Sequence, residues 1–215
     1  MRFKDRTDAG RRLAALLQEY RGREGVVLAL PRGGVPVGLE VARALDMPLD
    51  LVIARKIGHP DNPEYAIAAV TENGELAANP EEVERVDQDW YRRTVAAERQ
   101  EAQRRHARYL GNRPAAAIAG RVAIVVDDGI ATGLTVTAAL MDVRRRKPSR
   151  LVLAVPVAPR ETANRLSRLV DDFIAVGTPE YFMGAVGAYY SDFGQVTDEE
   201  VAAILAGARA TEPAT

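Results

Sequence analysis

Short apolar runs alternate with helical patterns along most of this 215-residue chain, and this alternation limits the folds open to it. Each run has a length within the four to eight residues that are usual for a buried strand. Strands that alternate with helices are typical of parallel sheets. The runs that we interpret as strands are 26–30, 49–55, 122–126, 151–157 and 172–177. We therefore predict an α/β fold: an open, mainly parallel sheet with helices on both faces and a small irregular C-terminal part.

The intervals between these runs carry apolar residues at helical spacing. The first helix should begin after a cap at Thr7 or Asp8, and the last should open with a capping box from Thr197 to Glu200. An Asn73-Gly74 pair predicts a hairpin turn. The expected helices cover 8–20, 35–45, 80–109, 133–146, 160–169 and 197–208.

Composition excludes several classes of function. Lys and Arg nearly balance Asp and Glu, giving a net charge of -1, so we expect no nucleic-acid partner. There is no cysteine, which excludes thiolate zinc sites and disulfides. No apolar run reaches the roughly 20 residues of a membrane-spanning helix, and the N-terminal segment is charged rather than signal-like. We expect a cytoplasmic protein without a membrane partner.

The stretch "DDGIATGLT", residues 127–135, follows an apolar strand and has the composition of a phosphate-binding loop. Gly129 and Gly133 let several backbone N–H groups turn toward one point, and the helix that begins there adds its free amides and positive dipole end. Thr132 and Thr135 add hydroxyl donors. Because the loop has no lysine, it is not a Walker-type nucleotide loop. It suits a phosphomonoester.

Two neighbouring carboxylates, Asp127 and Asp128, precede this loop. Like charges would repel a phosphate, but carboxylates accept hydrogen bonds from hydroxyl groups. The vicinal diol of a phosphorylated ribose offers two such donors close to its 5′-phosphate. The pattern therefore predicts a ribose 5-phosphate ligand, with its hydroxyls on the aspartates and its phosphate in the turn.

The stretch "VAIVVDDGIATGLT" resembles the ribose-phosphate motif of type I phosphoribosyltransferases. The resemblance implies a 5-phosphoribosyl 1-pyrophosphate substrate with Mg²⁺, and places Asp127 and Asp128 near the metal. It also implies transfer of phosphoribose to a nitrogen heterocycle, with a purine-like base favoured and pyrophosphate released. The implied substrate-binding residues are Asp127, Asp128, Gly129, Ile130, Ala131, Thr132, Gly133, Leu134 and Thr135.

Two further segments extend the resemblance. "LALPRGGVPVG" is similar to the family's pyrophosphate loop, often found around a non-proline cis peptide, and "ARKIG" to a basic step after the second strand. The implied pyrophosphate-binding residues are Arg32, Gly33, Gly34, Arg55 and Lys56, of which Arg32 and Lys56 would stabilise the departing anion. The opening "FKDRTDAGRRLAALL" resembles a bacterial group within the family whose acceptor is unassigned.

The residue that would carry the proton of the acceptor differs here from that in one branch of the family. Hypoxanthine/guanine members carry an aspartate where this chain has Ala131, so the sequence is closer to adenine-type members. In those, a glutamate of the mobile loop is the implied carrier, and Glu64 and Glu72 are the candidates here. His59 lies in the same loop, and His106 is expected at the surface without a partner.

The resemblance implies one domain over 1–215, with a mobile loop and helical insertion at 57–110 and a hood at 178–195 that reads the acceptor. Tyr181, Phe182 and Val186 are the expected base-binding residues. The helix at 80–109 could cover the site, form a homodimer contact or pack with a solvated face. The alternative function is a non-catalytic regulatory domain that senses phosphoribosyl pyrophosphate.

Overall fold

The computed structural model describes residues 1–111 and 115–209, and within them five strands form a parallel sheet in the order β2-β1-β6-β7-β8. This confirms the predicted α/β class with a mainly parallel sheet. The strands are β1 (Gly25–Ala29), β2 (Leu49–Leu51), β6 (Val122–Val126), β7 (Arg150–Val157) and β8 (Asp172–Gly177).

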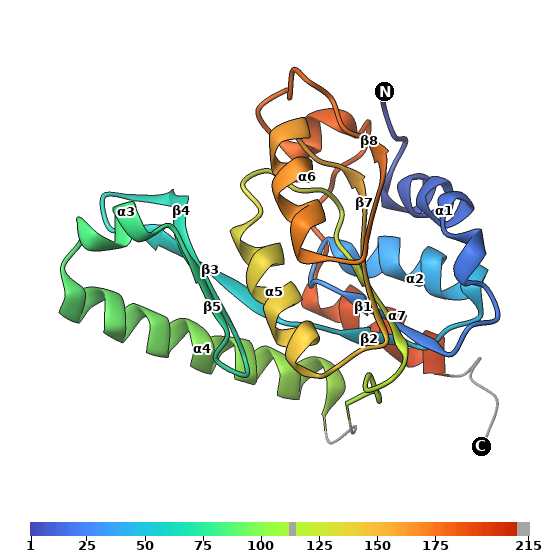
Figure 1. Cartoon of the computed structure of the whole chain (residues 1–215), viewed down its shortest axis with the longest axis horizontal. Helices are drawn as coiled ribbons and strands as arrows, with labels where there is room; N and C mark the ends of the chain where they lie inside the picture. The colour runs from blue at the N-terminus through green and yellow to red at the C-terminus, as the bar shows by residue number, and fades with distance from the viewer. Residues whose placement is uncertain (112–114, 210–215) are drawn as a thin grey trace.

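Helices cover both faces of this sheet (Figure 1). Successive strand residues alternate between the two layers: Val27 and Ile124 pack against one set of helices, and Leu28 and Val125 against the other. The first layer holds α1 (Arg6–Leu16), α2 (Gly34–Leu45) and α7 (Asp198–Arg209), and the second holds α5 (Leu134–Arg145) and α6 (Arg160–Leu166). Short 3₁₀ turns occur at Gln18–Tyr20, Ser167–Leu169 and Val186–Tyr189.

Residues 54–110, which we call the arm, extend away from the parallel sheet (Figure 1). A small antiparallel sheet packs against a long helix through a core of its own that includes Ile57, Ile67, Val70 and Tyr91. The arm comprises β3 (Ala54–His59), β4 (Asn62–Thr71), β5 (Leu76–Ala78), α3 (Pro80–Glu84) and α4 (Gln88–Leu110). Val83 of α3, Val86 of the connection and Trp90 of α4 pack against this core.

Two expectations for this region were wrong in detail. The strand at 49–55 ends at Leu51, and the chain then enters the second sheet at Ala54; continuous apolar character does not show a change of sheet. Strand β3 then pairs antiparallel with β4 in a hairpin. The helix at 80–109 is broken before α4, where Asp87 caps the new helix by accepting a hydrogen bond from the Trp90 N–H at 2.6 Å.

Local capping predictions had mixed outcomes. The capping box is confirmed: Thr197 Oγ1 accepts from the Glu200 N–H, and Glu200 accepts from the Thr197 N–H. The turn at Asn73-Gly74 also joins β4 to β5 as expected. The cap of α1 is Asp5, whose carboxylate accepts from the Asp8 N–H at 2.8 Å, so the expected cap at Thr7 or Asp8 was wrong. No helix in the described residues is long and apolar enough to span a bilayer.

We predict that Leu28→Ala in β1 lowers the free energy of unfolding by about 2–5 kcal/mol, because it leaves a cavity between strand and helices. Leu16→Ala, at a leucine that is 49% exposed, is the matched control and should cost within about 0.5 kcal/mol. Urea unfolding of both variants measures the difference. Equal losses would contradict the assignment of the core.

Candidate functional site

Two loops predicted to bind one ligand lie side by side at the carboxyl edge of the parallel sheet. Strands β1 and β6 pair in register, with Ala29 opposite Val126, and the Leu30 N–H donates to the Val126 carbonyl at 2.9 Å. The chain beyond each strand therefore leaves at the same point. This brings the 31–34 loop against the 127–135 loop, at the edge where ligands of open α/β sheets bind.

The contact between these loops requires glycine. A Cβ on Gly33 would overlap the Asp128 carboxylate, and one on Gly34 would lie 2.8 Å from the Val126 carbonyl oxygen. The peptide between Pro31 and Arg32 is cis. The loop is thus seated directly on the acidic doublet, so a ligand on one loop is within reach of the other.

The 127–135 turn presents free amides at the start of α5. Gly133 adopts a left-handed φ of 83° as the N-cap, and its carbonyl accepts from Thr137. The N–H groups of residues 131–135 have no protein acceptor within the described part of the chain, whereas the Ile130 N–H donates to Val157. Two carbonyls of the loop accept hydrogen bonds from α6: that of Ala131 from the Thr162 hydroxyl, and that of Thr132 from the Arg165 guanidinium. Such a turn can receive an anion through its amides.

The two carboxylates differ in their surroundings. Burial, reinforced by the neighbouring charge of Asp128, raises the pKa of Asp127 well above its usual value. Burial also raises the pKa of Asp128, while the Arg6 guanidinium opposes that rise. The doublet therefore bears its negative charge mainly on Asp128, opposite Arg6.

Arg6 is a site residue that sequence reasoning missed. Its Nε donates to Asp128 Oδ2 at 2.8 Å, its Nη1 donates to the Gly194 carbonyl at 2.7 Å, and its guanidinium lies 3.9 Å from the Phe193 ring centroid. The side chain is only 12% exposed. The available signal was the "FKDR" opening, which marked a resemblance but suggested no contact with the doublet.

The predicted pyrophosphate-binding side chains come from two places. Arg32 extends from the 31–34 loop toward α7, where its Nη1 lies 3.5 Å from Asp198. Arg55 and Lys56 lie on β3 of the arm. Arg55 is paired with Glu98 of α4 at 2.8 Å, and Lys56 with Glu64 of β4 at 2.9 Å.

The proton-carrier candidates are placed very differently. Glu64 is exposed on the β3–β4 hairpin, and His59 lies on the same hairpin. Glu72 instead contacts His106 of α4 at 2.6 Å, so the expectation that His106 has no partner was wrong. The neighbouring Asn73 donates to Asp142 near the C-terminal end of α5. Asp142 lies about 12 Å along the helix axis from Leu134, so Glu72 is placed toward the other end of α5 from the 127–135 turn.

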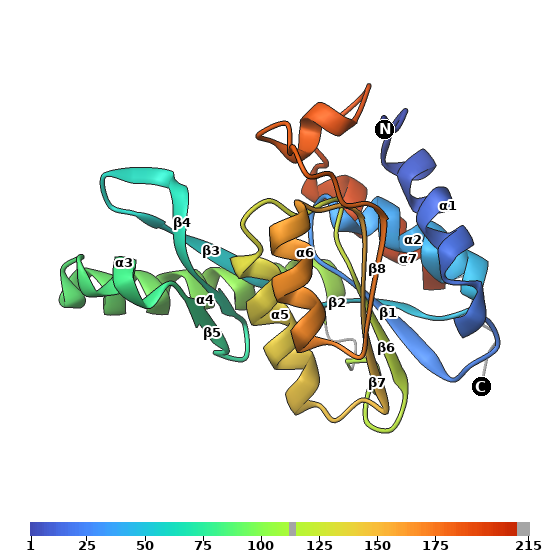
Figure 2. The same ribbon diagram turned by 45° about the horizontal axis from the view of Figure 1, so that its top comes forward.

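The hood, residues 178–195, lies above the carboxyl edge of the sheet and beside the N-terminal segment (Figure 2). Backbone hydrogen bonds join Phe3 to Tyr189 and Ser191 to Phe3, and the Tyr190 hydroxyl donates to the Asp128 carbonyl at 2.5 Å.

The three expected base-binding residues differ in exposure. Tyr181 is 89% exposed, whereas Phe182 stacks on Tyr189 with ring centroids 5.2 Å apart. Val186 lies so close to Gly129 that a Cβ on residue 129 would overlap the Val186 side chain. Val186 therefore links the hood to the 127–135 turn.

The doublet offers few protein ligands for a metal. Within the described residues, no group of three or more His, Cys, Asp or Glu side chains could enclose an ion. Mg²⁺ in phosphate-binding sites usually takes one or two carboxylates, with substrate oxygens and waters completing its shell. The pair of carboxylates fits that type of site.

Comparison with known proteins agrees with this geometry. A family described as "Phosphoribosyl transferase domain" matches residues 3–179. A Mycobacterium tuberculosis protein named "Putative phosphoribosyl transferase" is 42% identical over 205 residues, covering 94% of this chain and 46% of its own length. The chain thus spans about half of the curated relative. The crystal structure of TT1426 from Thermus thermophilus is 49% identical with a TM-score of 0.79, covering 95% of this chain and 98% of that one.

We predict that Arg6→Met lowers the free energy of unfolding by about 3 kcal/mol, because it leaves the Asp128 carboxylate buried without its partner. Adding Asp128→Asn should restore much of that loss, since the unpaired charge is then gone. A double-mutant cycle by urea unfolding at neutral pH measures the coupling. Strictly additive losses would show that the ion pair does not stabilise the site.

Proposed function

This chain belongs to the phosphoribosyl transferase family, and we propose that it transfers 5-phosphoribose from phosphoribosyl pyrophosphate to a nitrogen heterocycle, releasing pyrophosphate. We propose Mg²⁺ as its cofactor and a purine-like base as the favoured acceptor. The observation that carries the proposal is the contact of two loops of different chemistry, the amide-rich turn and the Gly33-Gly34 loop, around one acidic doublet.

The sugar phosphate would lie across the 127–135 turn. Its phosphate would take the free amides of residues 131–135 and the hydroxyls of Thr132 and Thr135, as an anion does at a helix N-terminus. Its diol would donate to Asp127 and Asp128. Arg6 would hold the second carboxylate in place and compensate its charge before the ligand arrives.

The leaving group would lie over the 31–34 loop. Bond breaking at the anomeric carbon leaves an electron pair on pyrophosphate, so stabilising that anion is the main task of the protein. The backbone at Gly33 and Gly34 can approach closely, and Arg32 supplies a cation. Mg²⁺, held by substrate oxygens with Asp127 and Asp128 nearby, would neutralise further charge when bound.

The arm and the hood would complete the site. Lys56 and Glu64 are paired on the exposed β3–β4 hairpin, so movement of this hairpin would bring either to the reacting atoms. Glu64 remains the proposed proton carrier, because Glu72 is held by His106 at the far end of α5. Tyr181, Phe182 and Val186 are the proposed acceptor contacts.

The test is a panel of purines, other N-heterocycles and amines incubated with phosphoribosyl pyrophosphate and Mg²⁺ and scored for pyrophosphate release. Release that depends on one acceptor class is the expected result. Tight calorimetric binding of phosphoribosyl pyrophosphate without release for any acceptor would instead favour the regulatory, ligand-sensing domain.

We predict that Asp128→Asn weakens ribose 5-phosphate binding by about tenfold or more, since hydrogen bonds to a charged group are worth about 1.5–3 kcal/mol. Asp89→Asn, at an exposed carboxylate on α4, is the control and should bind normally. Calorimetry with ribose 5-phosphate measures both variants. Unchanged affinity in Asp128→Asn would remove the diol assignment.

A further inference from the structure

One face of α4 carries a line of side chains that leads from the arm to the 31–34 loop. Glu98, Ala102, Arg105 and Tyr109 recur at helical spacing, and Ala102 is fully buried, so this face is turned inward. At one end of the line Glu98 accepts from Arg55 of β3 at 2.8 Å.

At the other end of the line Tyr109 donates to Asp198 at 2.6 Å, and Asp198 lies 3.5 Å from Arg32. Arg105 therefore lies on the same face of α4 between Glu98, the partner of Arg55, and Tyr109, which contacts the Asp198 partner of Arg32.

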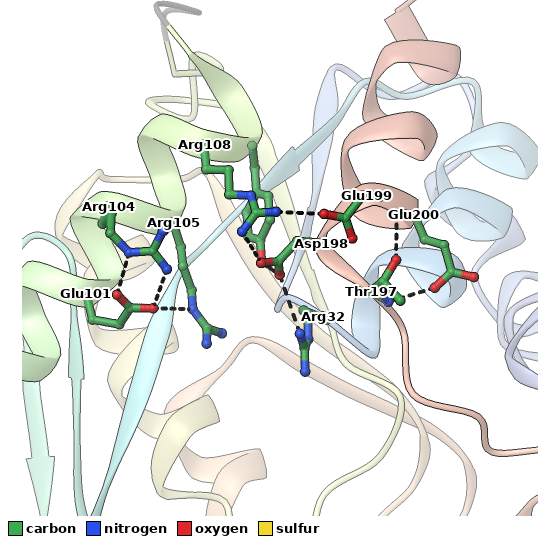
Figure 3. Close-up of polar contacts among 10 residues, drawn as sticks. Arg32, Glu101, Arg104, Arg105, Arg108, Thr197, Asp198, Glu199 and Glu200 are labelled. Carbon is green, nitrogen blue, oxygen red and sulfur yellow. Dashed lines mark hydrogen bonds and ion pairs between the residues drawn. The ribbon is translucent and has the colours of Figure 1, made fainter.

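The side chain of Arg105 is held through its Nε atom, and its two terminal Nη groups remain available to a ligand. Its Nε donates to Glu101 at 3.0 Å, and Arg104 donates to both oxygens of the same carboxylate. Among the described residues, no acceptor takes the terminal Nη groups of Arg105, although the side chain is only 21% exposed. Figure 3 shows the guanidinium ends of Arg105 and Arg32 extending to the same side of the cluster.

The charges around this point do not cancel. Four arginines, residues 32, 104, 105 and 108, share three carboxylates, those of Glu101, Asp198 and Glu199. A hydrogen bond from Tyr109, together with the charges of Arg108, Arg32 and Arg105, lowers the pKa of Asp198, so that carboxylate stays ionised at neutral pH. Among these ion-paired groups the arginines outnumber the carboxylates, and Arg105 and Arg32 keep free donors.

We propose that Arg105 is a further pyrophosphate-binding residue, delivered by the arm to act with Arg32 and Arg55. This inference rests on the proposed function. The Nη groups of Arg105 donate hydrogen bonds to non-bridging oxygens of the pyrophosphate. They do so as the bond to the anomeric carbon breaks and the electron pair stays on the leaving oxygen. Guanidinium groups suit this task because they present several donors in a planar fork.

The test measures calorimetric binding of inorganic pyrophosphate with Mg²⁺, and separately of ribose 5-phosphate, to the whole chain. Arg105→Gln should weaken pyrophosphate about tenfold, the effect of losing one charge-assisted interaction, and leave ribose 5-phosphate within about twofold. Arg104→Gln is the matched control, because it donates to the same Glu101 but is 57% exposed, and it should bind both ligands normally.

Two results would overturn the inference while the proposed function stands. One is an Arg105→Gln variant that binds pyrophosphate as the unsubstituted chain does. The other is loss of pyrophosphate and ribose 5-phosphate by the same factor, which indicates a general disturbance of the fold. If the unsubstituted chain binds neither ligand, both the inference and the proposed function are overturned.

Discussion

The in-register pairing of β1 with β6 is the constraint on which the site depends. Parallel neighbours end at the same edge of the sheet, so the residues that follow Ala29 and Val126 have to share one space. That space is small enough that Gly33 touches the Asp128 carboxylate and Gly34 approaches a strand carbonyl. Two glycines and two aspartates thus become one site through strand order, although about ninety residues separate them in sequence.

Close packing at this edge places negative charge where water is scarce, and the structure compensates for it locally. Arg6 is brought to Asp128 from α1, is held by Gly194 at the end of the hood, and stacks on Phe193. One guanidinium therefore joins the first helix, the acidic doublet and the hood. A comparable arrangement occurs at Asp198, where Arg108 and Tyr109 of α4 meet Arg32 of the 31–34 loop (Figure 3).

The sequence predicted the features that depend on neighbours in the chain. Apolar strands at 122–126 and 172–177, the capping box at Thr197 and the turn at Asn73-Gly74 follow from local pattern and propensity, and all are present. The adjacency of the two loops was also predictable, because strand ends of a parallel sheet converge. Features that depend on distant partners were not predictable in this way. The contact of Arg6 with Asp128 spans 122 residues, and that of His106 with Glu72 joins a helix to a hairpin tip.

The attachment of the hood has a consequence for divergence among relatives. Its end is joined to the N-terminal segment by backbone hydrogen bonds of Phe3, Tyr189 and Ser191, in which the side chains take no part. Substitutions of exposed hood residues such as Tyr181 and Met183 therefore need not disturb the sheet edge where the sugar phosphate is proposed to lie, whereas Val186 is constrained by its contact with Gly129. Such a division lets natural variation, or deliberate segment grafting, change the exposed part of the hood while the rest of the scaffold is inherited unchanged.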